Sequence, residues 1–178
     1  GNGGKSRNKV GLTHQTILIY SKGKMKFFGD NAREEFAEGS LKTHFKNVDD
    51  EGRRYRDRTV NGKTYRYYAD EGKRLGSVWT DCPAMAANSP ICGETTGYPT
   101  QKPLSLLTRI IELTTEPEDS VLDPFCGSGS TLEAAAKLGR RWVGIDQSEV
   151  AFQISTNRMS KIQEAAETFD FMLGLESE

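Results

Sequence analysis

Apolar residues in the second half of the chain recur with a helical period. In the segment KPLSLLTRIIELTT, residues 102–115, leucines and isoleucines are spaced three and four positions apart, which places them on one face of an α-helix. Pro103 stands at the predicted first helical position, where its missing amide hydrogen leaves no bond unmade. Glu116-Pro117 follows the segment and ends the predicted helix.

Two short apolar runs predict β-strands on either side of a second helix. The runs are residues 120–122 and 141–145. The alanine-rich segment between them predicts a helix over residues 130–138 that Gly139 closes, and a last helix is expected from about residue 148 to 166. Helices that alternate with strands through short links predict an α/β fold in which helices cover a parallel sheet.

The first half of the chain shows no sustained hydrophobic periodicity and no alternation of helices and strands. QTILIY, residues 15–20, predicts a strand, and a short helix is expected around residues 32–37. Asn61-Gly62 lies between two segments rich in Tyr, Thr and Arg, which predicts a β-hairpin because a type I′ turn needs positive φ at both central residues. Residues 71–101 are punctuated by Gly and Pro and are expected to be largely irregular.

The length and composition are those of a globular chain, either one ordinary domain or a small domain with an inserted lobe. Hydrophobic residues make up 35% of the 178 residues and charged residues 28%. No apolar run approaches the ~20 residues that span a bilayer, and the N-terminal GNGGKSRNKV lacks the apolar core of a signal peptide. The three cysteines are an odd number at no metal-ligand spacing. These features predict a cytoplasmic protein with no membrane association and no bound metal.

The formal net charge of −1 conceals two oppositely charged halves. Residues 1–75 hold 17 Lys and Arg against 10 Asp and Glu, whereas residues 76–178 hold 7 against 15. Such asymmetry is typical of a lobe that binds a polyanion beside a core with a different task. The alternative is that the basic half is a solvated surface without a partner.

An acidic residue ends each of the two predicted strands. In VLDPFCGSGSTLEAAAKLGRRWVGID, residues 121–146, Asp123 ends the first strand and Asp146 ends the second. Ligands of open α/β sheets lie at the carboxyl ends of the strands, so both acids are expected in one crevice. Gly127 and Gly129 allow the backbone to approach a ligand closely, and amides at the start of the next helix face it.

The residues of this crevice favour a ligand that carries both a ribose and an ammonium group. A carboxylate after the second strand can accept hydrogen bonds from both ribose hydroxyls. Leu132 stands where the dinucleotide motif needs its third glycine, and an acid ahead of the loop repels pyrophosphate but attracts an ammonium group. S-adenosylmethionine has both groups and is the predicted cofactor. The alternative is an ordinary β–loop–α turn without a ligand.

Two motifs follow one another within the second half of the chain. TGYPTQKPLSLLTRIIE occupies residues 96–112 and LDPFCGSGST occupies residues 122–131. This tandem resembles the site-specific DNA methyltransferases that modify adenine N6 or cytosine N4, in one permuted motif order. GLTHQTILIYSK resembles the family's strand before the target-recognition region, and VGIDQSEVAFQISTNRM resembles its strand and helix after the glycine loop. The resemblance implies a partial Rossmann-like, S-adenosylmethionine-dependent sheet with an inserted, basic target-recognition region.

The resemblance also implies roles for single residues. Asp123 would face the amino group of S-adenosylmethionine, Asp146 its ribose hydroxyls and Lys102 its carboxylate, while the glycine loop would surround the methionine part. Asp146 or Ser130 could instead cap a helix, and Lys102 could be a solvated lysine. The implied cofactor-binding residues are Thr100, Gln101, Lys102, Asp123, Pro124, Phe125, Cys126, Gly127, Ser128, Gly129, Ser130 and Asp146.

One motif of the family is not found in this sequence. The family binds the amino group of a flipped base with an Asp, Ser or Asn followed by Pro-Pro and an aromatic residue, whereas no two prolines are adjacent in the 178 residues. In the family's order that motif precedes the strand that residues 11–22 resemble. The chain is therefore expected to be a fragment that has no catalytic residue and needs the missing N-terminal part of the same methyltransferase. An exposed sheet edge is expected to pair with another chain, including a second copy.

The chain is expected to divide into three regions. These are a strand of the methyltransferase sheet in residues 1–22, a target-recognition region in 23–96 and a cofactor-binding region in 97–178. Double-stranded DNA is the expected partner of the middle region, because basic residues alternate with tyrosines along its predicted hairpin. The alternatives are a non-catalytic DNA-binding module that senses the cofactor, and a methyltransferase that acts on RNA or a small molecule. The expected DNA-binding residues are Arg53, Arg54, Arg56, Arg58, Lys63 and Arg66.

Overall fold

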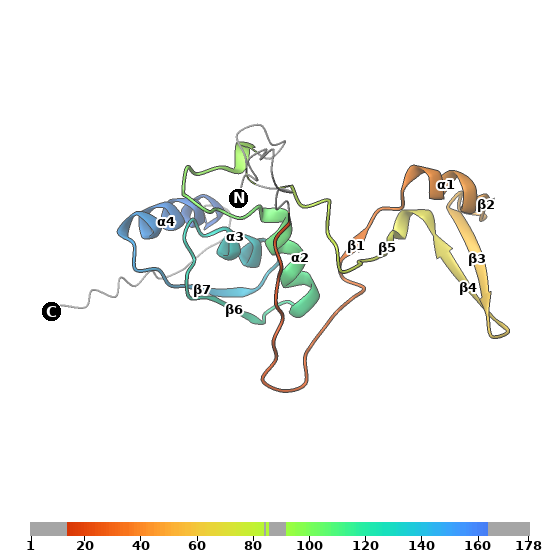
Figure 1. The fold of residues 1–178 in the computed structure, drawn as a ribbon, viewed down its shortest axis with the longest axis horizontal. Coiled ribbons are helices and arrows are strands. Elements are labelled where there is room, and N and C mark those ends of the chain that lie inside the picture. The colour runs from red at the N-terminus through yellow and green to blue at the C-terminus, as the bar shows by residue number, and fades with distance from the viewer. Residues whose placement is uncertain (1–13, 84, 86–91, 164–178) are drawn as a thin grey trace, which may run out of the picture.

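The chain forms a helical body and a smaller lobe that projects from it. A computed structural model describes residues 14–83, 85 and 92–163. Figure 1 shows the body around the helices α2 (Leu104–Thr114), α3 (Ser130–Lys137) and α4 (Glu149–Gln163), and the lobe around the hairpin of β3 (Arg54–Val60) and β4 (Lys63–Tyr68) at some distance from it. No helix among these residues is long and apolar enough to cross a membrane.

The body is built around a parallel βαβ unit. Strands β6 and β7 pair in parallel, with Val121 opposite Trp142 and Leu122 opposite Val143, and α3 connects them. This confirms the α/β class and the parallel sheet that the sequence predicts. The elements of the body are α2 (Leu104–Thr114), β6 (Ser120–Asp123), α3 (Ser130–Lys137), β7 (Arg141–Gly144) and α4 (Glu149–Gln163).

The helices bury one face of this sheet and leave the other open. Val121 and Trp142 pack against a core of buried residues from α2 and α3, which includes Ile111 and Ala134. Because side chains alternate along a strand, Leu122 and Val143 point to the opposite face, where they are 62% and 53% exposed. The described part of the chain therefore leaves an apolar sheet face without cover.

The ends of the body's helices differ slightly from the prediction. Helix α2 begins at Leu104, so Pro103 is its N-cap and not its first helical residue. Helix α3 ends at Lys137, and Gly139 follows it with a φ of 71°, the left-handed conformation that closes many helices. The predicted end of the last helix lies outside the described residues, since α4 is described only to Gln163.

The lobe contains a three-stranded antiparallel sheet and one short helix. Its strands are in the order β2–β3–β4, and Asn61 and Gly62 connect β3 to β4 with φ values of 50° and 76°, which confirms the predicted hairpin and its turn. The elements of the lobe and its stalk are β1 (Arg33–Glu34), α1 (Glu38–His44), β2 (Asn47–Val48), β3 (Arg54–Val60), β4 (Lys63–Tyr68), a 3-10 turn (Ala69–Glu71) and β5 (Lys73–Arg74).

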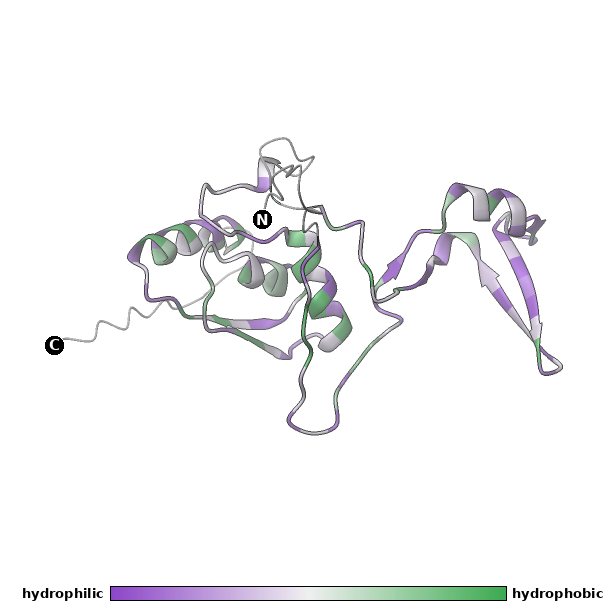
Figure 2. Cartoon of the chain, viewed as in Figure 1, coloured by the Kyte–Doolittle hydropathy of each residue, from purple (hydrophilic) through white to green (hydrophobic). Residues whose placement is uncertain are grey.

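Aromatic rings and one arginine form the interior of the lobe. Phe45 is fully buried, and its ring centre lies 4.6 Å from that of Phe36. The guanidinium carbon of Arg56 lies 5.0 Å from the centre of the Phe45 ring and 5.5 Å from that of Tyr67, within the range of a cation–π contact. Figure 2 shows little hydrophobic colour along β3 and β4 compared with the helices of the body. The lobe is therefore held together largely by aromatic and polar contacts.

A charged stalk connects the lobe to the body. Strands β1 and β5 pair antiparallel, which places Arg33 opposite Arg74 and Glu34 opposite Lys73. The carboxylate of Asp30 accepts hydrogen bonds from both arginines, at 2.7 Å from Arg33 and 3.0 Å from Arg74. One carboxylate thus neutralises the repulsion between two facing arginines.

Two elements of the first half are not as predicted. Residues 15–20 form no strand, because no described strand lies beside them, and the apolar side chains of this segment are largely exposed. The helix expected around residues 32–37 is also wrong. Residues 33 and 34 pair with β5, and the helix begins only at Glu38, where an acidic first turn and basic last turn suit the helix dipole.

Candidate functional site

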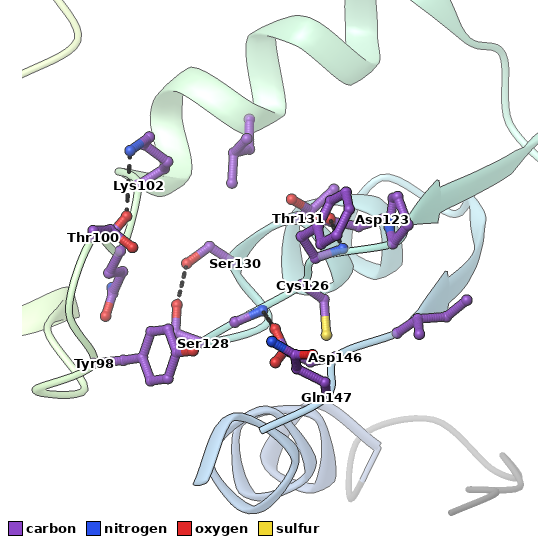
Figure 3. A pocket seen from close by; sticks show the side chains of 16 residues that line it. Tyr98, Thr100, Lys102, Asp123, Cys126, Ser128, Ser130, Thr131, Asp146 and Gln147 are labelled. Carbon is purple, nitrogen blue, oxygen red and sulfur yellow. Dashed lines mark hydrogen bonds between the residues drawn. The ribbon is translucent and has the colours of Figure 1, made fainter. Parts of the chain in front are cut away.

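A cavity of about 560 Å³ lies at the carboxyl end of β6 and β7 (Figure 3). It is formed by the glycine loop after β6, the residues after β7 and the segment before α2. Sequence reasoning did not select five of its lining residues: Tyr98, Leu107, Thr131, Ile145 and Gln147. Eleven of the twelve predicted cofactor-binding residues line it together, namely Thr100, Gln101, Lys102, Asp123, Pro124, Phe125, Cys126, Gly127, Ser128, Ser130 and Asp146.

Backbone hydrogen bonds attach the glycine loop to the end of β7. The amide of Ile145 donates to the carbonyl of Asp123, and the amide of Cys126 donates to the carbonyl of Ile145, both at 2.9 Å. The amide of Gly127 donates to Oδ2 of Asp146 at 2.9 Å. The loop after β6 and the residues after β7 are thus joined by hydrogen bonds, and together they form one wall of the cavity.

Each glycine of the loop meets a close neighbour. Gly127 has a φ of 49°, and a Cβ there would lie 2.9 Å from the ring of Tyr98. Gly129 has a φ of 73°, and a Cβ there would lie 2.9 Å from Cβ of Ser155 on α4. Gly129 therefore lets the loop approach α4 rather than the cavity, which explains why it is the predicted site residue that does not line it.

Two carboxylates lie on this wall. Asp123 is the last residue of β6, as predicted, and its Oδ1 accepts a hydrogen bond from the amide of Phe125 at 3.1 Å. Asp146, predicted as the last residue of its strand, instead lies two residues beyond β7, which ends at Gly144 because the chain there turns to meet the glycine loop. Both acids nevertheless line the same cavity.

The carboxylate of Asp146 retains capacity for a ligand. Its Oδ1 accepts from the amide of Ser148 and its Oδ2 from the amide of Gly127, each at 2.9 Å. Ser148 directly precedes α4, and its hydroxyl accepts from the amide of Ala151 at 3.3 Å, so Ser148 and not Asp146 is in the N-cap position. Each carboxylate oxygen has two lone pairs, so two acceptor sites of Asp146 are left for other donors.

Cys126 lies between the two acids. Burial raises the pKa of its thiol, and the negative charges of Asp123 and Asp146 raise it further. The thiol is therefore neutral near pH 7, and the two carboxylates set the electrostatic character of the wall. A cationic group is favoured in this part of the cavity.

The segment before α2 forms the opposite wall. Figure 3 shows Tyr98, Thr100 and Lys102 on one side of Ser128 and Ser130, and Asp123, Cys126 and Asp146 on the other. Thr100 adopts a left-handed φ of 65°, and Lys102 Nζ donates to its carbonyl at 3.3 Å. The lysine thereby places a positive charge on the wall opposite the carboxylates.

Gln101 shapes this wall from beneath. It is 9% exposed, and its side-chain oxygen accepts from the amide and the hydroxyl of Thr96 at 2.9 and 2.8 Å. Its amide nitrogen donates to the carbonyl of Glu94 at 2.7 Å, while a carboxylate oxygen of Glu94 caps the amide of Leu104. These bonds use most of the amide group of Gln101, so its observed contacts hold the segment in shape.

Ser128 and Ser130 are almost fully buried, and their hydroxyls are 3.1 Å apart. The ring of Phe125, by contrast, is 86% exposed at the mouth of the cavity. The ring of Tyr98, which was not among the predicted site residues, packs against Gly127. Its place inside the motif TGYPTQKP was the available signal, since Thr100, Gln101 and Lys102 of the same motif were already linked to the cofactor.

Most of the basic residues of the hairpin make contacts within the lobe. Both Nε and a terminal nitrogen of Arg53 donate to Asp70 at 2.9 Å. Arg54 donates to the carbonyls of Phe45 and Leu41 at the end of α1. These two arginines hold the hairpin against its neighbouring turn and helix.

Arg66 is likewise engaged inside the lobe, whereas two basic residues near the turn are not. Arg66 forms a two-bond ion pair with Asp57, at 2.9 and 3.0 Å, and this contact lowers the pKa of Asp57. The side chains of Arg58 and Lys63 form no hydrogen bond or ion pair with another residue of the described ranges, although Lys63 Nζ lies 5.3 Å from the ring centre of Tyr65.

Several known proteins are similar to this chain. The Type II methyltransferase M.EcaI of Enterobacter cloacae is 48% identical over 65 residues, which is 36% of this chain and 14% of that protein. The Type II methyltransferase M2.LlaDCHI of Lactococcus lactis subsp. cremoris is 38% identical over 92 residues, 52% of this chain and 33% of that protein. The chain thus spans a third or less of the length of these relatives.

A solved structure is also similar to part of the chain. The crystal structure of the M1.HpyAVI-SAM complex is 40% identical over 42% of this chain and 35% of that chain, with a TM-score of 0.38. A family model described as DNA methylase, for N6 and N4 methyltransferases, matches residues 2–157. Because the match covers most of its length, this chain belongs to the DNA methylase family of N6 and N4 methyltransferases.

Proposed function

We propose that the chain supplies the S-adenosylmethionine-binding and DNA-recognising parts of a methyltransferase that modifies adenine N6 or cytosine N4. The observation that carries the proposal is the cavity at the ends of β6 and β7, where two carboxylates face a wall that carries Lys102. Its volume of about 560 Å³ lies within the ordinary range of cofactor sites.

The residues of the cavity fit S-adenosylmethionine group by group. Asp123 would attract the amino group of the methionine part and Lys102 would attract its carboxylate, and both residues line the cavity. The two unused acceptor sites of Asp146 suit the two ribose hydroxyls. When bound, the cofactor supplies an electrophilic methyl group, and the residues of the cavity would hold and orient that group.

Duplex DNA is the proposed substrate of the lobe. Residues 1–75 carry the basic excess of the chain, and the hairpin presents six basic residues together with tyrosines. The candidate DNA-binding residues are Arg53, Arg54, Arg56, Arg58, Lys63 and Arg66. Phosphate contacts by such residues position a protein on DNA, and groove contacts by arginine read bases.

The group that holds the target amine is proposed to come from another polypeptide segment of the same methyltransferase. The 178 residues contain no Pro-Pro pair. The open sheet face around Leu122, Val143 and Ile145 is an apolar surface on which such a segment can pack. A homodimer formed through the free edges of β6 and β7 is the competing arrangement, which the mass of the purified chain in solution distinguishes.

Calorimetric titration with S-adenosylmethionine tests the cofactor assignment. The parent chain should bind, and Asp146→Ala should bind about 5- to 150-fold more weakly, because two hydrogen bonds to the ribose are worth about 1–3 kcal/mol together. Asp50→Ala, which removes an equal charge from an exposed residue of the lobe, is the matched control and should bind like the parent. Equal binding by Asp146→Ala and Asp50→Ala would remove Asp146 from the site.

A further inference from the structure

We infer that the outer part of the β3–β4 ribbon, on the face that carries Arg58, Val60, Lys63 and Tyr65, is the surface that contacts duplex DNA. This face is called the tip face below. The inference rests on the proposed function and narrows it, since it assigns the remaining basic residues of the hairpin to holding the lobe together.

The pairing of the ribbon places these four side chains together. Arg58 is directly opposite Tyr65, and Val60 is directly opposite Lys63. Directly opposed residues of an antiparallel pair point to the same face, and residues two apart along one strand do so as well. All four side chains therefore belong to one face next to the turn, and all four residues are exposed.

Both cations of the tip face are available to a partner. No carboxylate of the described residues pairs with Arg58 or Lys63. Lys63 instead lies over the ring of Tyr65, a contact that leaves its ammonium hydrogens free. The side chain of Arg58 has no ring contact, hydrogen bond or ion pair among those residues. The tip face thus presents two positive charges without local compensation.

The other basic residues of the hairpin lack this freedom. Arg53 and Arg66 are paired with Asp70 and Asp57, so each contributes no net charge to its surroundings. Arg54 donates its hydrogen bonds to the carbonyls of Leu41 and Phe45 at the end of α1. The guanidinium of Arg56 is enclosed by aromatic rings, and its Nε is buried. Use of these four residues by DNA would require contacts of the lobe to break.

The opposite face of the same ribbon is neutral and internally bonded. There the hydroxyls of Thr59 and Thr64 are 3.0 Å apart, and the pair of Asp57 and Arg66 lies next to them. The two faces of one ribbon therefore differ in charge while they share a backbone and a turn. Because only the tip face carries uncompensated positive charge, a polyanion is expected to bind there and not on the opposite face.

The chemistry of the tip face suits a duplex better than an acidic protein surface. The fork of an arginine matches a phosphate or a guanine edge, a lysine supplies a mobile point charge, and a tyrosine hydroxyl donates to phosphate. A two-stranded ribbon fits within a major groove about 12 Å wide. The face lies next to the turn between β3 and β4, and Figure 1 shows that this turn is at the outer end of the lobe.

The test compares two double variants of the full chain with equal net charge. Arg58→Gln/Lys63→Gln removes the two tip charges, and Lys24→Gln/Lys46→Gln removes two exposed lysines that lie outside β3 and β4. Binding to a short fluorescent duplex of mixed sequence is followed by anisotropy over a series of salt concentrations, without cofactor. The tip variant should bind on the order of tenfold more weakly at low salt, with a shallower salt dependence by about 2 in log–log slope.

Each outcome decides the inference. A loss confined to the tip variant supports it. Equal losses in both variants would assign the binding to overall charge and overturn it, and so would a tip variant that binds like the parent. Excess polyglutamate that competes as well as unlabelled duplex would identify an acidic protein surface as the partner instead. A parent chain that binds no duplex would contradict the DNA part of the proposed function itself, and cofactor titration tests the other part separately.

Discussion

The amide of Gly127 donates a hydrogen bond to Oδ2 of Asp146 over 2.9 Å. This bond connects the turn after β6 to the turn after β7, two segments that are 19 residues apart in sequence. The acid assigned to the ribose is therefore also the residue that holds the glycine loop in place. Its removal affects both the ligand site and the stability of the loop.

Asp146→Ala should lower the free energy of unfolding by about 1–2 kcal/mol, because the amides of Gly127 and Ser148 both lose their acceptor. Urea denaturation of the chain without cofactor measures this change. Asp50→Ala, in the exposed part of the lobe, should leave stability within about 0.5 kcal/mol of the parent. An unchanged midpoint for Asp146→Ala would show that water replaces the carboxylate at no cost.

Gly129→Ala and Gly139→Ala form a matched pair. Both residues have a φ near 70°, at 73° and 71°, but a Cβ at 129 would lie 2.9 Å from Ser155 whereas a Cβ at 139 meets nothing within 4 Å. The variant at 139 should lose about 1–2 kcal/mol from backbone strain alone. The variant at 129 should lose about 1–3 kcal/mol more, since α4 must move away from the loop. Equal losses in urea denaturation would mean that α4 adjusts freely.

Arg54→Ala should unfold the end of α1 while Arg58→Ala should not. Arg54 donates to the carbonyls of Leu41 and Phe45, so its loss leaves acceptors in a partly buried place and costs about 1–3 kcal/mol. Hydrogen exchange of the amides of α1, read by mass spectrometry, should accelerate in the first variant only. Faster exchange in Arg58→Ala than in Arg54→Ala would contradict the inference that Arg54 holds the lobe together while Arg58 is free to contact a partner.

Alkylation of Cys126 by iodoacetamide should be slow at about pH 8 and faster as the pH rises, because only the thiolate reacts. Burial first, and then Asp123 and Asp146, raise the pKa of this thiol, so less thiolate is present at a given pH than for an ordinary cysteine. Asp123→Asn removes one of these charges, which lowers the pKa and should speed the reaction. Mass spectrometry of the peptide that contains Cys126 gives the rate. The chain in urea is the reference, and a native rate equal to it would contradict the raised pKa.

The chain by itself should transfer no methyl group to DNA. Transfer to an exocyclic amine needs the base to leave the stack and the amine to be held in line with the methyl group. The acceptor and Pro-Pro-aromatic motif for this task do not occur in the 178 residues. Labelled cofactor should therefore give no incorporation into any duplex, and incorporation should appear when a segment with that motif is joined or added. Turnover by the purified chain would require a catalytic group that the proposal does not contain.

The parts of the structure that sequence reasoning predicted well are those with a local signal. The strand, glycine loop and helix from Ser120 to Lys137 follow from apolar periodicity and from two glycines, and the hairpin follows from Asn61-Gly62. The cavity could be anticipated because the carboxyl ends of parallel strands meet, whichever residues fill the rest of the sheet. Short-range rules were enough in each case.

The parts that were missed depend on partners distant in the chain. Residues 33 and 34 are a strand only because residues 73 and 74 lie beside them, and residues 15–20 are not a strand because no described segment pairs with them. The alternation of Arg and Tyr in the hairpin also did not show which arginines would be engaged. Arg66 is engaged because Asp57 is its cross-strand partner, a pairing that follows from the two-residue turn at Asn61-Gly62 and not from the alternation itself.

The stalk gives the lobe a stiffness that depends on salt. Asp30 joins Arg33 to Arg74 across the two strands that enter and leave the lobe, and Lys73 pairs with Glu34 beside them. Counterions screen such exposed pairs over about 10 Å at 0.1 M ionic strength. Salt that weakens the attraction of a polyanion to the tip face therefore also weakens the ion pairs of the stalk. The affinity of the tip face and the rigidity of the stalk thus both depend on ionic strength.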